Sequence, residues 1–288
     1  MKNKIGIIVV SYHNPKMTLR FVERELPKLS MSYTLIIVNV ASSKEESAEL
    51  ANACKAIFIP DDNAETIPCG SKYVIWTSQN LGYAKGNNKG VGFLNRMGTF
   101  THFLFSNDDI EIKNSDILER LCASMEEQDS IGIVGPRIIG LDGKEQSPHD
   151  RYISPQRQIG WRLLKSFRRQ KKNAHILREK NEKETPRITY WVCGAFMFVD
   201  ALSFNKVGGF DKRTFLYYEE VILSERFKGI GKNTLYVPNC CVVHFEGGSS
   251  KKTSSEKSKQ INKESSLVYY EYYRKVNPVL LMLYKLIC

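Results

Sequence analysis

Short apolar runs alternate with segments of helical spacing through the first half of this chain, and that alternation constrains the fold more than any other feature. The predicted strands are residues 4–10, 34–40, 57–60, 73–76, 101–105 and 131–136, and the predicted helices are residues 16–29, 42–53, 84–97 and 115–127. Strands separated by helices of roughly 10–15 residues are typical of βαβ units and a mainly parallel sheet. The sequence therefore predicts an α/β fold whose ligands bind beyond the carboxyl ends of the strands.

The second half of the chain is less regular. Its pattern predicts a strand-like run over 187–200, a helix over 215–229, two short strands over 234–245, a flexible Ser/Lys-rich loop over 249–264, and helices over 267–273 and 278–287. Residues 151–184 are basic and carry the apolar stripe Trp161, Leu164 and Phe167. That stripe indicates an amphipathic helix or a mobile loop.

Positive charge is concentrated in two segments. The chain of 288 residues has 42 Lys and Arg against 31 Asp and Glu, a net charge of +11. Residues 151–187 hold 12 Lys and Arg against 3 Glu, and residues 251–288 hold 8 against 3. Such segments indicate a surface that meets phospholipid headgroups, a phosphorylated substrate or nucleic acid, and the alternative is a solvated basic face.

Composition excludes several classes of protein. A content of 42% hydrophobic and 25% charged residues excludes wholesale disorder. No apolar run approaches the ~20 residues that span a bilayer, and we expect no signal peptide. The 7 cysteines show no CxxC pair, which indicates reduced thiols and not a disulfide framework or a zinc site. The usual glycine-rich dinucleotide and P-loop motifs are also absent.

Two polar clusters in the first half are candidates for ligand binding. Asn107, Asp108 and Asp109 directly follow the predicted strand 101–105, where carboxylates can hold Mg²⁺ or Mn²⁺; the alternative is an ordinary turn. The glycines of segment 80–90 flank a predicted helix start, where backbone N–H groups can approach an anion. The alternative there is a loop followed by a capped helix.

Two further clusters lie in the second half. The segment 208–211 is followed by the adjacent Glu219 and Glu220, of which one can face a crevice while the other holds the scaffold. The alternative is a solvated helix start, where negative charge is favoured. His244 opens the last cluster, 244–249, and a lone histidine is more often structural than a ligand.

Taken together and in order, these clusters resemble glycosyltransferase family 2, the inverting enzymes of GT-A fold. The resemblance is strongest to the rhamnosyltransferase-like branch of bacterial polysaccharide assembly, and it covers about residues 4–250. That branch carries V-x-Y-N, N-x-G-F-A-x-G-N-N-x-G, N-x-D, G-G-F-D, F-x-Y-x-E-D and H-x-x-G-x-S. The matching segments here are 10–14, 80–90, 107–109, 208–211, 215–220 and 244–249.

The resemblance implies a single GT-A domain over 1–250, with a nucleotide-binding half (1–110), an acceptor-binding half (111–250) that holds the basic insertion 151–187, and a basic, apolar helical tail over 251–288. It assigns the divalent cation, Mg²⁺ or Mn²⁺, to Asp109 and His244, and the catalytic base to Glu220. The positions that it assigns to donor binding are Ser11, Tyr12, Asn39, Asn80, Gly82, Gly86, Asn87, Asn107 and Asp108.

The chain departs from the family pattern at three positions. Asn39 stands where the family has an aspartate that contacts the nucleobase, and an amide can donate as well as accept hydrogen bonds. Glu220 replaces the catalytic aspartate and is one methylene longer. Ile222 stands where an aspartate is usual.

The resemblance implies a metal-dependent inverting glycosyltransferase that moves a sugar from a nucleotide-sugar donor to a glycan or lipid-linked acceptor in cell-surface polysaccharide assembly. The alternative is a catalytically impaired sugar-nucleotide-binding protein of the same fold. Nucleic acid is not an expected partner, because no helix-turn-helix, zinc or RNA-binding signature accompanies the charge. The basic segments and the apolar run 279–283 fit a cytoplasmic enzyme held peripherally on the anionic inner face of the cell membrane.

Overall fold

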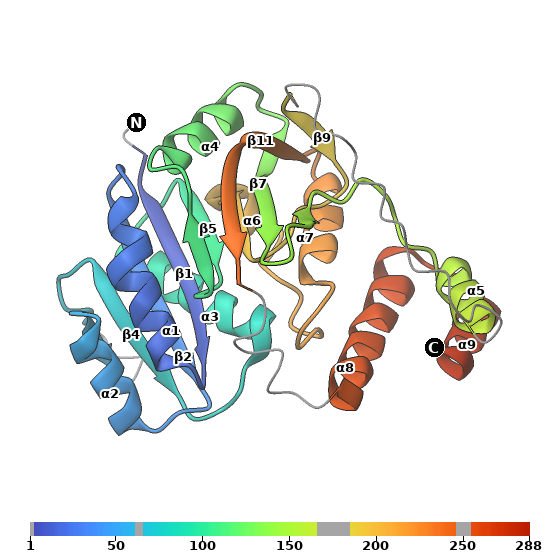
Figure 1. Cartoon of the computed structure of the whole chain (residues 1–288), viewed down its shortest axis with the longest axis horizontal. Coiled ribbons are helices and arrows are strands. Elements are labelled where there is room, and N and C mark those ends of the chain that lie inside the picture. The colour runs from blue at the N-terminus through green and yellow to red at the C-terminus, as the bar shows by residue number, and fades with distance from the viewer. Residues whose placement is uncertain (1–2, 61–65, 166–184, 246–254) are drawn as a thin grey trace.

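One mixed sheet forms the body of the protein in the computed structural model, which describes residues 3–60, 66–165, 185–245 and 255–288 (Figure 1). In the described part of the chain the order of strands is β3-β4-β2-β1-β5-β10-β7-β11-β6, with β8 on β7 and β9 on β11. The strands are β1 (Ile5–Tyr12), β2 (Tyr33–Val40), β3 (Ile57–Ile59), β4 (Lys72–Thr77), β5 (His102–Ser106), β6 (Ile110–Ile112), β7 (Ile131–Gly140), β8 (Glu145–Ser147), β9 (Arg187–Thr189), β10 (Phe196–Asp200) and β11 (Asn233–His244).

Helices cover both faces of this sheet. The helical elements are α1 (Pro15–Arg20), η1 (Phe21–Glu25), η2 (Leu26–Lys28), α2 (Lys44–Ala53), α3 (Gly82–Met97), α4 (Ile117–Glu126), α5 (Pro155–Lys165), α6 (Ala201–Lys206), α7 (Glu219–Lys228), α8 (Ser255–Val268), η4 (Tyr269–Tyr273) and α9 (Pro278–Ile287). One buried cluster joins one face of the sheet to α1, α2 and α4, and a second joins the other face to α3, α6 and α7. Strands covered on both faces are nearly all apolar, which is why the strand runs were readable from the sequence.

The predicted α/β class and the parallel first half are confirmed. β1 pairs in parallel with β2 and β5, and β4 pairs in parallel with β2 and β3. The helix predicted to open at a serine does so at Ser43, whose hydroxyl and the Glu46 carboxylate form a reciprocal capping box.

Three predictions about the second half were wrong in detail. The run 187–200 is two strands, β9 and β10, because the chain breaks pairing around Gly194. The two short strands expected over 234–245 are the single strand β11, with an irregular register between Val237 and Cys241 where Pro238 has no N–H to donate. Residues 255–264, expected as loop, belong to α8, and the rest of that predicted loop lies outside the described residues.

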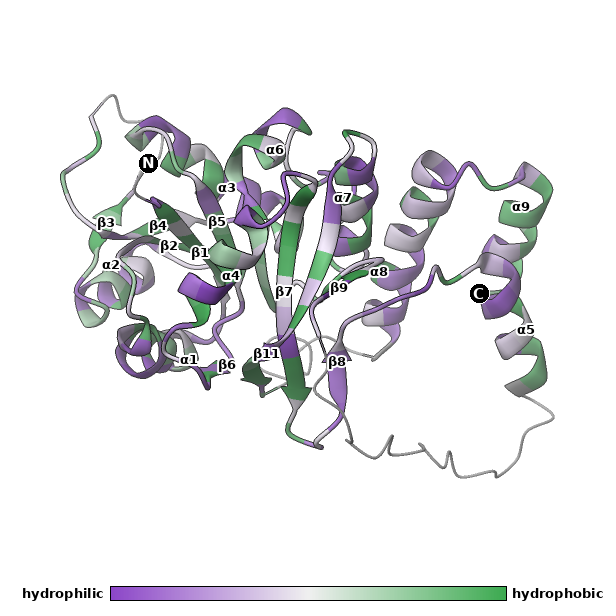
Figure 2. Ribbon diagram, turned by 90° about the horizontal axis from the view of Figure 1, so that it is seen from above, coloured by the Kyte–Doolittle hydropathy of each residue, from purple (hydrophilic) through white to green (hydrophobic). Residues whose placement is uncertain are grey.

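The C-terminal elements pack with α5 against α7 and form a third buried cluster. Its core joins Val221 and Ile222 of α7 to Tyr269 and Tyr270 of η4 and to Leu281 and Tyr284 of α9. Ile222 is completely buried there, so the extension explains why an apolar residue replaces the family's aspartate at this position. α5 and α9 lie beside one another at the end of the molecule opposite α2 (Figures 1 and 2). Within the four described stretches, none of the helices combines the length and apolar character needed to cross a bilayer.

Candidate active site at the carboxyl ends of the strands

Asp109 and His244 meet beyond the end of β5. Asp109 Oδ1 lies 3.1 Å from His244 Nε2, and Asn107 Nδ2 lies 3.2 Å from the same ring nitrogen. On the other side of the ring, His244 Nδ1 lies 2.7 Å from Gln146 Oε1. Because that carbonyl oxygen can only accept, Nδ1 donates to it, and in the neutral imidazole Nε2 then presents a lone pair to the site. Gln146, which the sequence did not single out, therefore orients the imidazole as the outer partner of a metal ligand does.

This pair of side chains fits a hard divalent cation. Two ligand atoms at about 2.1 Å from an octahedral cation, at right angles, lie about 3 Å apart. The carboxylate and imidazole acceptors of Asp109 and His244 show that spacing. No cluster of three or more His, Cys, Asp or Glu side chains occurs among the described residues. The remaining ligands of a cation here would thus be diphosphate and water oxygens, as is usual for Mg²⁺.

Ser11 and Asp108 turn inward and do not line the edge of the sheet. Thr18 Oγ1 donates to Asp108 Oδ2 at 2.6 Å and lies 2.7 Å from Ser11 Oγ. Burial raises the pKa of Asp108 to about 6. These two side chains join α1 to the strand ends, so any contribution that they make to donor binding is through the backbone or through that packing.

Tyr12 and Asn39 lie at neighbouring strand ends. The half-buried Tyr12 ring packs against His13, with ring centroids 4.3 Å apart. Asn39 is buried and donates through Nδ2 to Ser47 Oγ of α2 at 3.0 Å. An aspartate cannot make that donation, so the departure from the family pattern has a local structural partner.

The glycine-rich segment mainly packs α3 against its neighbours. Asn80 Oδ1 accepts the N–H of Gly82 at 3.1 Å. Gly82 has φ +65°, and a Cβ there would lie 2.1 Å from the carbonyl oxygen of Phe215. At Gly86 a Cβ would lie 2.9 Å from Val10 of β1, so α3 sits close against that strand.

Two asparagines of α3 have different partners. The buried Asn87 donates to the Tyr83 carbonyl within the helix at 3.0 Å. Asn88 belongs to the same motif but is assigned no role from the sequence. It bonds both the N–H and the carbonyl of Phe210, at 2.9 and 2.8 Å, and so holds the segment 208–211.

Glu220 is fixed at the start of α7 by the backbone of Gly194. The Gly194 N–H donates to Glu220 Oε1 at 2.9 Å, while Tyr83 Oη donates to the Gly194 carbonyl at 2.8 Å. A Cβ at position 194 would lie 2.7 Å from Glu220 Oε1 and 2.7 Å from Tyr83 Oη, so a larger residue would displace these side chains. Burial raises the pKa of Glu220 above its ordinary value. The glycine inside the predicted strand-like run was the sequence signal for this close approach.

Its neighbour Glu219 belongs to the scaffold. Only 2% of Glu219 is exposed, and Oε1 has no hydrogen-bond partner among the described residues. Burial, and then the adjacent Glu220, raise the pKa of Glu219 well above its ordinary range. Burial thus favours the neutral form of the Glu219 carboxyl, while the Glu220 carboxyl reaches the Gly194 backbone.

The candidate base, Glu220, and the candidate cation ligands, Asp109 and His244, lie at the same edge of the sheet. Gly194 binds Glu220, and the next residue, Ala195, accepts the Asn107 N–H through its carbonyl at 2.9 Å. This proximity follows from topology, because β10 runs antiparallel to β5 and begins where β5 ends.

Asp211 is bonded to other residues of the scaffold. Burial alone would raise the pKa of Asp211, but hydrogen bonds from Arg213 and Tyr273 lower it to about 2. The Tyr273 hydroxyl donates to Asp211 Oδ2 at 2.6 Å, and Arg213 binds the same oxygen at 2.6 Å. The contact with Tyr273 ties the segment 208–211 to the C-terminal extension.

Comparisons with known sequences identify rhamnosyltransferases as relatives. No protein-family model matches the chain. It is 24% identical over 239 residues to the N-acetylglucosaminyl-diphospho-decaprenol L-rhamnosyltransferase of Mycobacterium tuberculosis (strain H37Rv), which covers 78% of this chain and 77% of the relative. It is also 26% identical over 167 residues to rhamnosyltransferase WbbL of Escherichia coli (strain K12), which covers 57% of this chain and 61% of the relative.

Solved structures show the same fold at low sequence identity. The mannosyltransferase PcManGT from Pyrobaculum calidifontis, solved with GDP-Man and Mn²⁺, superposes with a TM-score of 0.59 at 11% identity, covering 97% of this chain and 68% of that one. GalNAc-T7, solved with UDP, GalNAc and Mn²⁺, gives a TM-score of 0.59 at 15% identity and covers 94% and 49%. The predicted GT-A fold is confirmed by these structures, and the sequence relatives indicate a glycosyltransferase that is similar to rhamnosyltransferases.

Proposed function

We propose that the chain is a metal-dependent inverting enzyme that transfers a hexose or deoxyhexose from a nucleotide-sugar to a glycan or lipid-linked acceptor in cell-surface polysaccharide assembly. One observation carries this proposal. The Gly194–Ala195 backbone binds Glu220 on one side and Asn107 on the other, so a candidate base and a candidate cation pair lie at the same strand ends. The relatives' names support the classes of donor and acceptor, since both are rhamnosyltransferases and one name includes a diphospho-decaprenol-linked sugar.

Asp109 and His244 would hold Mg²⁺ or Mn²⁺, with Gln146 keeping the imidazole lone pair directed at the site. When bound, such a cation neutralises the charge that develops on the leaving diphosphate. Asn107 contacts the same imidazole, and by the resemblance we assign it to the ribose of the donor. The donor would lie along the strand ends between this pair and the start of α3.

Glu220 would act as the general base. Its Oε1 is held by the Gly194 N–H, so Oε2 is the atom that we assign to the acceptor hydroxyl. The hydroxyl proton moves to Oε2, the hydroxyl oxygen forms a bond to the anomeric carbon, and the bond from that carbon to the diphosphate oxygen breaks on the opposite face. A carboxylate whose pKa is raised by burial is better matched to proton transfer near neutral pH than an exposed one.

Replacing Asp109 tests the assignment of the cation site. In Asp109→Asn the charged ligand is lost, so Mn²⁺-dependent affinity for the donor's nucleoside diphosphate should fall by at least roughly 10–100-fold. Calorimetric titrations of UDP, GDP and dTDP, each with and without Mn²⁺, measure this directly. Glu111→Gln is the matched control, because it removes a carboxylate two residues along the chain that pairs instead with Lys113. Equal affinity in Asp109→Asn, or no effect of Mn²⁺ on the unaltered protein, would contradict the assignment.

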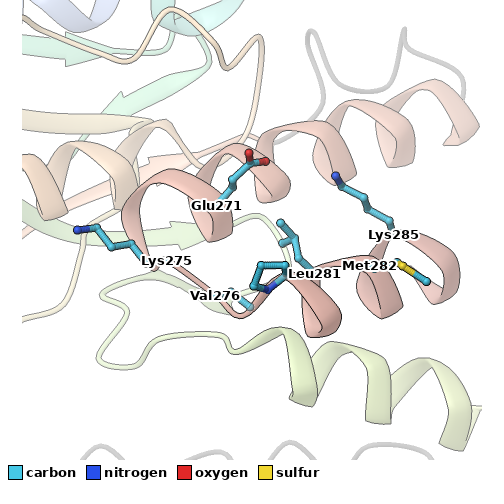
Figure 3. Close-up of a pocket in the computed structure, with 7 residues that line it drawn as sticks. Glu271, Lys275, Val276, Leu281, Met282 and Lys285 are labelled. Carbon is cyan, nitrogen blue, oxygen red and sulfur yellow. The ribbon is translucent and has the colours of Figure 1, made fainter.

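We also propose that α5 and α9 hold the enzyme on an anionic membrane. Both helices expose large apolar side chains, including Trp161 at 67% on α5 and Leu286 at 72% on α9. A cavity of about 500 Å³ lies beside α9. Its lining includes the apolar Leu281 and Met282, with Lys275 and Lys285 on either side of Leu281 (Figure 3). Apolar side chains flanked by lysines are typical of helices that lie in the headgroup region.

Removing exposed apolar side chains tests the membrane contact. The double variant Trp161→Ser/Leu286→Ser should bind vesicles of anionic phospholipid at least tenfold more weakly, because burying one such side chain contributes about 1.5–3 kcal/mol. Leu202→Ser is the matched control, since Leu202 is 78% exposed on α6, away from this surface. Co-sedimentation at low and high salt measures binding, and high salt should weaken it. An unaltered protein that ignores anionic vesicles at low salt would refute this contact.

A further inference from the structure

The segment that leads into the candidate base has an unusual backbone. Tyr217 and Tyr218 both adopt the left-handed conformation, with φ of 73° and 68°. Residues other than glycine rarely adopt this backbone conformation, and two in succession persist only where surrounding contacts hold them. Tyr218 is the N-cap residue of α7, and its carbonyl accepts the Ile222 N–H at 3.0 Å in the first turn. The position of Tyr218 therefore sets the position of Glu219 and Glu220.

Contacts from three other elements hold this segment. The Phe215 carbonyl accepts the Tyr83 N–H of α3 at 2.9 Å. The Leu216 carbonyl accepts the Ser265 hydroxyl of α8 at 2.8 Å. The Tyr218 hydroxyl accepts Nε2 of Gln158, on α5, at 3.0 Å.

Gln158 connects Tyr218 to two further tyrosines. Its Nε2 also donates to the Tyr270 hydroxyl at 2.6 Å, and its Oε1 accepts the Tyr284 hydroxyl at 2.9 Å. Tyr270 in turn donates to the Ile153 carbonyl at 2.8 Å, which fixes the direction of its hydroxyl. Both N–H groups and the carbonyl of the amide are thus used, and they join α5 to the start of α7, to η4 and to α9. A fully satisfied polar network inside an apolar cluster specifies one arrangement of its members.

We propose that Gln158 is a positioning residue for Glu220, acting through the hydroxyl of Tyr218. The proposal rests on the proposed role of Glu220 as base. Without the amide, Tyr218 loses its hydrogen bond to α5, and the start of α7 can shift away from the Gly194 N–H. The hydrogen bonds of Gln158 go to Tyr218, Tyr270 and Tyr284 and not to the cation pair, so affinity for the nucleoside diphosphate with Mn²⁺ should be nearly unaffected.

The test compares Gln158→Ala with Gln156→Ala, the same substitution at an exposed position of the same helix. We expect kcat of Gln158→Ala to fall about tenfold, because displacement of a reacting group by a fraction of an ångström is costly. Its Kd for the nucleoside diphosphate with Mn²⁺ should change by less than about twofold. Gln156→Ala should match the unaltered enzyme in both. Hydrogen exchange of the peptide covering residues 214–222, measured without substrate, should rise only in Gln158→Ala.

A double-mutant cycle tests the route through Tyr218. Tyr218→Phe removes the same hydrogen bond, so the double variant Gln158→Ala/Tyr218→Phe should be no slower than Gln158→Ala alone. Additive losses would overturn the route. Tyr218→Phe removes only one hydroxyl, so it decides the question if Gln158→Ala does not fold: a loss of about tenfold supports the proposal and unchanged kcat overturns it.

The failure of this proposal differs from a failure of the proposed function. If Glu220→Gln is inactive while Gln158→Ala behaves as Gln156→Ala, the base stands and the positioning role is wrong. If Gln158→Ala loses donor affinity as much as kcat, its effect is general damage, and the proposal is again wrong. If Glu220→Gln is fully active, the assignment of the base is wrong, and the positioning role that rests on it is overturned too.

Discussion

Replacing Glu220 by glutamine is expected to lower kcat by about 10²–10⁴-fold, the range that a general base typically contributes. Glutamine has the same size and keeps an oxygen that can accept the Gly194 N–H, but it cannot take a proton from the acceptor hydroxyl. Affinity for the donor nucleotide should be nearly unchanged, because the candidate cation pair is left intact. Single-turnover transfer and nucleotide titrations separate the two quantities. Undiminished turnover in Glu220→Gln would contradict the assignment.

The companion variant, Glu220→Asp, should also be poor, although the family has aspartate at this position. The 2.9 Å contact between Glu220 Oε1 and the Gly194 N–H depends on the longer side chain.

The acid limb of the pH profile, where kcat/KM rises with increasing pH, offers a further check on Glu220. Burial raises the pKa of Glu220, so its active carboxylate form should appear only at a pH above the pKa of an ordinary glutamate. Activity should therefore rise with pH through this limb. A limb at the ordinary glutamate pKa would show that Glu220 is not the titrating group.

Gly82→Ala is expected to cost about 3 kcal/mol or more of unfolding free energy. Its φ of +65° is strained for alanine, and the added Cβ would lie 2.1 Å from the backbone carbonyl of Phe215, which cannot swing aside as a flexible side chain can. A loss of this size should lower Tm by roughly 6–12 °C. Thermal and denaturant unfolding measure both quantities.

The matched control for Gly82→Ala is Gly92→Ala in the same helix. A Cβ at position 92 would have no heavy atom within 4 Å, and the position lies in the helix interior, where alanine is favoured over glycine. This control should gain about 0.5–1 kcal/mol. Equal stability of the two variants would mean that α3 and the Phe215 segment do not approach as closely as described.

The inward direction of some side chains of the site can be predicted from the alternation of side chains along each strand. Ile7 and Val9 of β1 face the cluster formed with α1 and α2, so Ser11, two residues on, continues the same face. Asn39 follows Leu35 and Ile37 of β2 in the same way and meets α2. The family motifs assign these side chains to donor binding. The alternation of side chains along each strand predicts instead that they point toward the helices.

Other parts of the site depend on contacts between distant segments and could not be derived from local patterns. Gly194 and Glu220 meet only because β10 inserts beside β5, an antiparallel pairing that the alternation of strands and helices does not predict. α8 was missed because its first turns are rich in Ser and Lys. Ser265 and Ser266 connect it to Leu216 and Tyr284 by hydrogen bonds, and the apolar contacts of its described residues with the third cluster come only from Leu267 and Val268 at its end.

Helix α7 is shared between two cores, and this sets where the chain can be cut and rejoined. Leu223 and Phe227 pack into the cluster that joins the sheet to α3 and α6. Val221 and Ile222 pack instead against the tyrosines of the C-terminal extension. A chimera that exchanges only the residues after 254 with those of a relative would leave Val221 and Ile222 facing side chains that did not evolve with them. Exchange of the C-terminal helices by segment swapping therefore has to carry positions 221 and 222, together with α5.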